Sequence, residues 1–416
     1  MAVVDNTIND KKRKGRLTMA ENKRKVGGVV IMHPGQNNYG TSLQGLATIR
    51  VIQSLGYPFR IIRYNKKRSL TDIIKTLPGY LRSGALNSFL HSHKQKRLTK
   101  QHIEFARIKK ERTDAVNRFK AKYLEPLCDY YTGWNALCEG SKNYDVVFVG
   151  SDQVWGPLSL YAGFYNLMFV DKSIPQFSYS SSFGKSFIMD HQKKGVARFL
   201  NKMDAIAVRE VRGAEIVKEL TGREATVVAD PTLLLTKEQW EEEVRESKAE
   251  YKEKYILCYM LGPRTDNREA VTRLGKELGL KVVTFNHMDW YEPADEGFGD
   301  ITNCNSDCLD FVKLLANAEY VVTDSFHCSV FSIIFHKKFL TFYRLNPSDK
   351  KSSHSRIDSL LGLMGLQDRA VKDTICDLKP AITNDADWSV VDKNLDALRQ
   401  ESMEFLTKAL EINKNN

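Results

Sequence analysis

The chain has 416 residues, of which 42% are apolar and 27% charged, the ordinary composition of a globular protein. This length exceeds what a single hydrophobic core usually fills, so we expect two domains. No apolar run approaches the roughly 20 residues that a membrane-spanning helix requires. The N-terminus also lacks the apolar core of a secretion signal, and we therefore expect a cytoplasmic protein.

The cysteine pattern argues against both a disulfide framework and a metal site. The seven cysteines are odd in number and scattered, which fits a reducing compartment. Cys304 and Cys308 are spaced C-x-x-x-C, but a structural zinc site needs a second pair of ligands at short spacing, and the sequence has none. We expect buried or surface thiols, no metal and no cofactor.

The net charge of +11 raises the question of a nucleic-acid or membrane partner. The excess is local, because eight basic residues lie in the first 25 positions and eleven lie between Lys94 and Lys122. Such a distribution argues against a protein that binds anionic partners over its whole surface, and we expect no nucleic-acid partner. The stretch from Lys94 to Lys122 is either a solvated face or a surface for peripheral contact with the anionic inner face of a membrane.

The predicted elements begin after a polar, aperiodic and basic tail over residues 1–26, which we expect to be disordered. A helix is predicted over Thr41–Leu55. Apolar, nearly continuous strands are predicted at Gly28–His33, Phe59–Tyr64, Tyr144–Gly150, Gln176–Ser181, Ala205–Val208 and Thr226–Ala229. Strands of this kind, alternating with helical segments, are typical of a parallel sheet covered on both faces. Residues 66–124 interrupt the alternation and predict an insertion of two or three basic helices.

A second alternating set follows the charged segment Lys237–Tyr251. Its strands are predicted at Tyr255–Leu261, Lys281–Phe285, Tyr320–Thr323 and Phe339–Phe342, and an amphipathic helix at Val391–Ile412. We predict two doubly wound, Rossmann-like α/β domains facing each other, the arrangement called GT-B among glycosyltransferases. The N-terminal domain would span 27–236, the C-terminal domain 252–380 and the last helix 388–413.

Four polar or glycine-rich segments directly follow predicted strands, where ligands bind in doubly wound sheets. They are Pro34–Gly40, Gly150–Trp155, Val208–Glu210 and Thr323–His327. The first, with Asn37 and Asn38, lacks the dinucleotide and P-loop patterns. The last places Thr323 and Ser325 at a helix start beside His327, which suits an anion and a proton-transfer group. Its alternative is a helix cap with His327 merely packed.

The two middle segments also allow two interpretations each. Asp152, Gln153 and Trp155 combine a carboxylate, an amide and an indole, the groups that hold sugars; the alternative is a turn whose Trp155 fills the domain interface. Arg209 is suited to bind a carboxylate or phosphate through two parallel hydrogen bonds. Its alternative is a surface pair with Glu210.

Six short motifs in a fixed order resemble the polysaccharide pyruvyl transferase family. They are N-x-Y-G-T-x-L-Q (37–44), G-S-D-Q-V-W (150–155), S-Y-S-S-S-F-G (178–184), V-R-E (208–210), D-P-T-L-L-L (230–235) and T-D-S-F-H (323–327). The resemblance runs from residue 28 to Arg369. It implies a GT-B-like fold and places Arg209 and His327 at the donor site. Better-studied members carry R-L-H where this chain has Ser325-Phe326-His327, so Arg356 and Arg344 are the candidates to supply the missing cation.

The resemblance implies transfer of the pyruvyl group of phosphoenolpyruvate onto sugar hydroxyls, forming a ketal. The acceptor would be a cell-surface polysaccharide or its lipid-linked precursor. We expect His327 to act as acid and base and Asp152 to orient or deprotonate the acceptor. The expected substrate-binding residues are Arg209, Ser325, Thr323, Asn37, Asn38, Gln153, Trp155 and Arg356. Two alternatives stay open: a GT-B glycosyltransferase with a nucleotide-sugar donor, and a non-enzymatic basic module.

Overall fold

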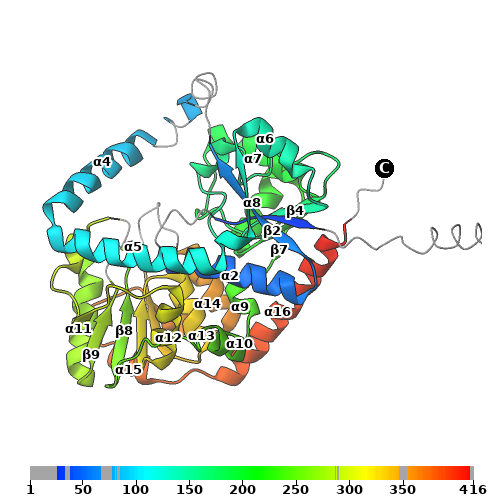
Figure 1. Ribbon diagram of the computed structural model, residues 1–416. Helices are drawn as coiled ribbons and strands as arrows, with labels where there is room; N and C mark the ends of the chain where they lie inside the picture. The colour runs from blue at the N-terminus through cyan, green and yellow to red at the C-terminus, as the bar shows by residue number, and fades with distance from the viewer. Residues whose placement is uncertain are drawn as a thin grey trace, which may run out of the picture.

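The computed structural model describes residues 26–32, 38–66, 77–79, 81, 85–285, 287, 290–345 and 354–412. Asn37 and nearly all of the predicted N-terminal tail therefore lie outside the described residues. The described chain forms two parallel sheets, each covered by helices (Figure 1). These are the two facing α/β domains of a GT-B-like fold, as predicted.

The N-terminal domain contains a seven-stranded parallel sheet in the order β3-β2-β1-β4-β5-β6-β7. Its strands are β1 (Gly27–Val30), β2 (Phe59–Asn65), β3 (Cys128–Thr132), β4 (Val146–Val149), β5 (Gln176–Ser181), β6 (Ala205–Val208) and β7 (Thr226–Val227). Its helices are α2 (Tyr39–Ser54), α6 (Trp134–Ser141), α7 (Asp190–Lys202), α8 (Val211–Thr221), α9 (Pro231–Leu234) and α10 (Lys237–Glu243). The chain order reverses between β1 and β4, which is where such sheets bind ligands.

The C-terminal domain contains a six-stranded parallel sheet in the order β10-β9-β8-β11-β12-β13. Its strands are β8 (Tyr255–Tyr259), β9 (Lys281–Thr284), β10 (Ile301–Thr302), β11 (Tyr320–Thr323), β12 (Lys338–Phe342) and β13 (Ala370–Val371). Its helices are α11 (Thr265–Leu278), α12 (Cys308–Asn317), α13 (Phe326–Ile334), α14 (Ser355–Met364) and α15 (Lys379–Thr383). The reversal here falls between β8 and β11, so β11 delivers its polar end to the switch point.

The final helix, α16 (Trp388–Leu410), joins the two domains along one side (Figure 1). Ser402 Oγ accepts a hydrogen bond from the Ala229 backbone of the N-terminal domain at 2.8 Å. Arg399 Nε donates to the Leu233 carbonyl at 2.6 Å. The helix therefore crosses back onto the first domain, as the sequence predicts. None of the described helices has the length and apolar character needed to cross a membrane.

The predicted basic insertion contains α4 (Ala85–Gln101) and α5 (Ile103–Tyr123). Helix α5 lies across the C-terminal domain, whereas α4 projects away from both sheets (Figure 1). The expectation of a uniformly exposed basic surface is wrong for α5, because Arg112 is fully buried and Lys120 nearly so. Arg112 Nη2 donates to the Asn303 carbonyl, so this cation holds α5 to the C-terminal domain instead of facing solvent.

Tyr39, the first residue of α2, anchors the N-terminal domain to the C-terminal domain. Its ring is fully buried and stacks on Phe311 with centroids 4.8 Å apart and an interplanar angle of 17°. Its hydroxyl donates to the Ser306 carbonyl at 2.9 Å. This anchor fixes the start of α2, and with it the next residue Gly40, against the second domain.

Candidate active site

Side chains from four strand ends meet between the two sheets. Asp152 follows β4, Arg209 follows β6 and Asp230 follows β7, whereas His327 lies in the first turn of α13, after β11. We call these four residues the polar cluster. His327 Nε2 lies 3.6 Å from Asp230 Oδ2, so the cluster spans both domains. Three of the four were predicted from the sequence as site residues.

Arg209 is the hub of the N-terminal half of the cluster. Its guanidinium lies 2.9 Å from Asp230 Oδ2, 3.4 Å from Asp152 Oδ1 and 3.5 Å from Glu210 Oε1. The Phe326 ring covers it at 4.2 Å. Burial alone would lower the pKa of Arg209, but the three carboxylates raise it above its usual value. The predicted pair with Glu210 therefore exists but is buried, and the contacts of Arg209 are with protein carboxylates.

Asp152 is held as a buried carboxylate. Thr41 Oγ1 donates to its Oδ2 at 3.1 Å, and its φ of 71° lies in the left-handed region, which is strained for a residue with a side chain. Burial raises the pKa of Asp152, but the charges of Arg209, His327 and Arg356 outweigh it and lower the pKa. The residue is therefore ionised at neutral pH and suited to accept a proton or a hydrogen bond.

Asp230 is the functional candidate that the sequence reasoning missed. Its Oδ2 accepts from Ser151 Oγ at 2.8 Å and its Oδ1 from Thr232 Oγ1 at 2.7 Å. Burial raises its pKa, but the positive charges of His327 and Arg209 lower it well below the ordinary value. The D-P-T motif reads as a helix cap, and Asp230 does cap α9 through the Thr232 backbone. The sequence signal that could have identified it was the motif itself, because an aspartate that caps a helix through one carboxylate oxygen can contact other residues through the second.

His327 occupies a space that only a glycine at position 40 leaves open. A Cβ built on Gly40 would lie 2.2 Å from His327 Nδ1. The imidazole is 7% exposed, and within the described residues its Nε2 makes no hydrogen bond. At 3.6 Å from Asp230 this nitrogen is beyond hydrogen-bond length but within range of an ion pair. The ring is therefore placed to exchange a proton with a third group.

At the start of α13, the two hydroxyl side chains that were predicted to bind substrate, Thr323 and Ser325, differ in their contacts. Thr323 is fully buried; its Oγ1 donates to the Tyr259 carbonyl at 2.6 Å and accepts from the Ser325 N–H at 2.9 Å. Thr323 thus has a structural role, which corrects its assignment to substrate binding. Ser325 is the N-cap of α13 but makes no side-chain cap hydrogen bond, so its hydroxyl is not committed to the helix.

Gln153 and Arg356 meet across the two domains. With its amide oxygen turned toward Arg356, Gln153 accepts from the two terminal guanidinium nitrogens at 2.8 and 3.3 Å. Burial and the charges of Arg209 and Arg344 lower the pKa of Arg356 to about 10, so it stays charged at neutral pH. Arg344 Nη2 donates to the Asp324 carbonyl at 3.2 Å. Arg356, one of the two candidates for the cation that the motif lacks, therefore lies beside the polar cluster.

The structure corrects the predicted substrate contact of Trp155, whereas that of Asn38 stays a prediction. Trp155 is fully buried; its Nε1 donates to the Tyr165 carbonyl at 3.1 Å, and its ring packs on Phe183 and Phe199. The indole belongs to the core of the N-terminal domain, and neither face is open to a sugar. Asn38 caps α2, where its Oδ1 accepts from the Gly40 N–H at 2.9 Å.

The described residues contain no group of three or more His, Cys, Asp or Glu side chains arranged to hold a metal ion. All seven cysteines are free thiols, and Cys308 is buried whereas Cys304 is partly exposed.

Two parallel α/β domains that bring charged strand ends together across their interface define a GT-B-like architecture. A family model described as polysaccharide pyruvyl transferase matches residues 38–346, which is most of the chain. The chain belongs to the polysaccharide pyruvyl transferase family and is a transferase. No curated protein sequence matches it as a relative.

Solved structures of similar shape share little sequence with this chain. UDP-GlcNAc 2-epimerase from Methanocaldococcus jannaschii is 11% identical, with a TM-score of 0.49, covering 93% of this chain and 99% of that one. The Neisseria meningitidis UDP-GlcNAc 2-epimerase bound to UDP-GlcNAc is 9% identical, with a TM-score of 0.48 and the same coverage. MurG from Acinetobacter baumannii is 10% identical, with a TM-score of 0.43, covering 92% and 98%.

Proposed function

We propose that this transferase moves the pyruvyl group of phosphoenolpyruvate onto two hydroxyls of a glycan acceptor, forming a cyclic ketal. The family membership supports the class of reaction. The observation that carries the proposal to particular atoms is the meeting of His327 and Asp230, from opposite domains, close to the buried arginines Arg209 and Arg356.

The donor would bind on the C-terminal side of the polar cluster. Three protein carboxylates surround the Arg209 guanidinium, whereas Arg356 is a second buried arginine beside Asp152 and Gln153. A bound anion would favour the charged form of Arg356, whose pKa is lowered first by burial and then by the charges of Arg209 and Arg344. The N-terminus of α13 and the Ser325 hydroxyl supply further donors for a phosphate. We therefore assign the anionic groups of the donor to Arg356 and Ser325.

Arg209 takes a different role from the one predicted. Because its guanidinium contacts three protein carboxylates beneath the Phe326 ring, we assign it to positioning Asp152 and Asp230 rather than to direct contact with the donor.

The chemistry begins with protonation of the methylene carbon of phosphoenolpyruvate. His327, paired with Asp230, would donate this proton, so that the neighbouring carbon becomes electrophilic. A first acceptor hydroxyl adds there and loses its proton, for which Asp152 is the nearby carboxylate. Phosphate then leaves and the second hydroxyl adds with loss of its proton. The products are the ketal, whose new methyl group carries the proton from His327, and inorganic phosphate.

Ligand-induced thermal shift distinguishes this proposal from the nucleotide-sugar alternative. We expect millimolar phosphoenolpyruvate to raise the melting temperature, because a ligand that binds only the folded state stabilises it. UDP and UDP-GlcNAc should leave it unchanged. Stabilisation by UDP, with no effect of phosphoenolpyruvate, would establish the alternative in its place.

The proposed acceptor includes a lipid-linked precursor, which would require peripheral contact with a membrane. The outer face of α4 supports this part of the proposal: Leu90 is 57% exposed and lies on one face with Lys94 and Arg97, also exposed. Co-sedimentation with anionic and neutral vesicles tests it. Equal partitioning to both kinds of vesicle would argue that the face only adds solubility.

A further inference from the structure

A groove of about 550 Å³ lies between α4, the adjoining turn of α5 and the loop after β9. It is lined by His91, Ser92, Gln95, Lys96, Thr99, Lys100, Lys109 and Trp290. We call this the cationic groove. The lining combines three ammonium groups with hydroxyls, an amide and an indole, and among the described residues it includes no carboxylate.

The positive charge of the groove has little compensation from its own helix. Residues 85–101, which form α4, contain no Asp or Glu at all. On α5, by contrast, Arg107 is paired with both Glu104 and Glu111. Lys96 and Lys100 lie one turn apart on the same face of α4, so two exposed charges are held side by side.

Contacts with the C-terminal domain fix the shape of the groove. Gln95 Oε1 accepts from the Tyr291 N–H at 3.1 Å. His91 meets the edge of Trp290, with ring centroids 5.7 Å apart and an interplanar angle of 83°, and His102 stacks on Tyr291 at 3.8 Å. The groove is therefore a built feature, with walls from two consecutive helices and from Trp290, which is distant from them in the sequence.

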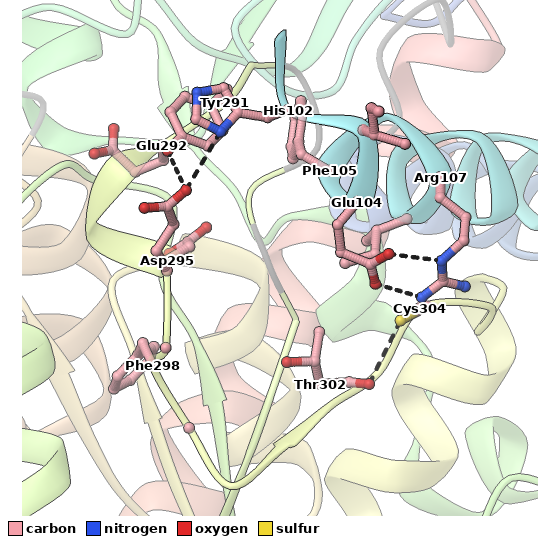
Figure 2. Close-up of a pocket in the computed structure, with 15 residues that line it drawn as sticks. His102, Glu104, Phe105, Arg107, Tyr291, Glu292, Asp295, Phe298, Thr302 and Cys304 are labelled. Carbon is pink, nitrogen blue, oxygen red and sulfur yellow. Dashed lines mark hydrogen bonds and ion pairs between the residues drawn. The ribbon is translucent and has the colours of Figure 1, made fainter. Parts of the chain in front are cut away.

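A neighbouring cavity of about 610 Å³ has the opposite charge and serves as an internal comparison (Figure 2). Its lining includes Glu104, Glu292, Asp295 and Glu296 against the single cation Arg107. An anion would be repelled from that cavity and attracted to the cationic groove. Tyr291 lines this cavity, and the adjacent residue Trp290 lines the cationic groove, so the difference in charge is local and sharp.

We propose that the cationic groove binds the anionic groups, carboxylate or phosphate, of the glycan acceptor. The lysines supply point charges for these groups, and the Trp290 indole supplies a flat apolar wall for a sugar ring. A concave groove of this volume suits a few sugar units better than it suits a flat leaflet. The assignment to the acceptor rests on the proposed function and extends it to a substrate class.

The groove is connected to the polar cluster through α5. Lys109 lines the groove, and Arg112, three residues later, lies 5.6 Å from the Tyr39 ring. Tyr39 is followed by Gly40, which faces His327. A glycan chain of several units would extend from the groove along α5 while one unit reacts.

The test compares two charge-matched variants of the full chain. Lys96→Glu/Lys100→Glu changes the groove, and Lys94→Glu/Arg97→Glu changes the outer face of the same helix by the same net charge. Fluorescence polarisation would measure the affinity for labelled oligogalacturonate, for oligo(glycerol phosphate) and for neutral maltohexaose, without phosphoenolpyruvate. We expect at least one anionic probe to bind more tightly than maltohexaose. The groove variant should weaken that probe about tenfold or more, and the outer-face variant less than about threefold.

A second variant removes the aromatic wall without changing charge. Trp290→Ala should weaken the same probe about fivefold. Equal loss in both charge variants, or an anionic affinity no better than that for maltohexaose, would overturn the proposal. So would a groove variant that loses binding to vesicles of phosphatidylglycerol and phosphatidylcholine but keeps glycan affinity. Because binding is measured without donor, failure of pyruvyl transfer would leave this result intact.

Discussion

His327 of the C-terminal domain lies with its Nε2 3.6 Å from Oδ2 of Asp230 in the N-terminal domain. Because the two residues come from different domains, the distance between them depends on how the domains pack against each other. The fully buried Tyr39 ring docks α2 on the second domain, and Gly40 leaves the space that the imidazole fills. The proton-transfer pair is therefore a product of how the domains dock.

Replacing His327 by Gln should preserve the fold and donor binding while lowering turnover about 10²- to 10⁴-fold, because proton transfer typically contributes that much. Phosphate release from phosphoenolpyruvate in the presence of acceptor would be the measurement. The matched control is His336→Gln, since His336 pairs with Asp392 on the surface. A His327 variant that keeps more than about a tenth of the rate would assign the residue to packing.

Gly40→Ala should imitate the loss of His327 without touching it. The added methyl group would meet His327 Nδ1 at 2.2 Å, so the ring must shift from its present position. We expect turnover to fall about tenfold or more, while Gly195→Ala, where a Cβ meets nothing within 4 Å, has no effect on rate. Full activity of Gly40→Ala would show that the position of His327 does not limit the reaction.

Asp230→Asn should destabilise the protein by about 3–5 kcal/mol, because it breaks a buried ion pair and leaves Arg209 undercompensated. Urea denaturation would measure the change. Asp396→Asn is the control: this carboxylate is 72% exposed and pairs with Arg399 only on the surface, so we expect a change within about 0.5 kcal/mol. An Asp230→Asn variant as stable as the control would show that Asp230 does not stabilise the protein through the buried network.

The same carboxylates predict a dependence of stability on acid pH. The pKa values of Asp152 and Asp230 are both lowered in the folded state, so their contribution is complete above the ordinary aspartate pKa of about 3.9 and declines as pH falls below it. Asp230→Asn should therefore lose less stability than the wild type between about pH 5 and pH 2. Parallel curves for the two proteins would contradict this assignment.

Arg209→Lys and Arg356→Lys should separate positioning from donor binding. A lysine at 209 cannot reach three carboxylates at once, so we expect a lower melting temperature and kcat, with a smaller change in the KM for phosphoenolpyruvate. A lysine at 356 should raise that KM about tenfold. Arg369→Lys is the control, because this buried arginine lies outside the polar cluster, where its Nη1 donates to the backbone carbonyls of Ala381 and Asn384 and its Nε lies 3.4 Å from Asp368 Oδ2. If Arg209→Lys raised the KM for phosphoenolpyruvate more than Arg356→Lys did, Arg209 would be the residue that contacts the donor directly.

The sequence predicted the architecture well because parallel strands buried on both faces leave uninterrupted apolar runs. Gln176–Ser181 and Ala205–Val208 were predicted with the bounds that the structure shows. The polar edge strand β3 (Cys128–Thr132) was missed, since its alternating exposure gives no such run. Asp152, Arg209 and His327 were found because each directly follows a recognisable strand.

The residues whose roles were predicted wrongly show what a single sequence does not reveal, namely which polar side chains tertiary packing buries. Trp155 and Thr323 have the side chains of a binding site, and only the tertiary packing shows that both are fully buried. Arg112 looks like part of a solvated basic stretch until α5 is seen to rest on the C-terminal domain. Asp230 needed the opposite correction, because a helix-capping pattern concealed the oxygen that faces His327.

The central claim is that phosphoenolpyruvate binds between the domains, with its anionic groups at Arg356 and Ser325 and its methylene carbon toward His327. A crystal structure of the His327→Gln variant with phosphoenolpyruvate tests this directly, because turnover is slowed while the donor site is kept. The account predicts a phosphate or carboxylate of the donor within hydrogen-bond distance of the Arg356 guanidinium and the Ser325 hydroxyl. Phosphoenolpyruvate bound elsewhere, or excluded while UDP occupies the domain interface, would contradict it.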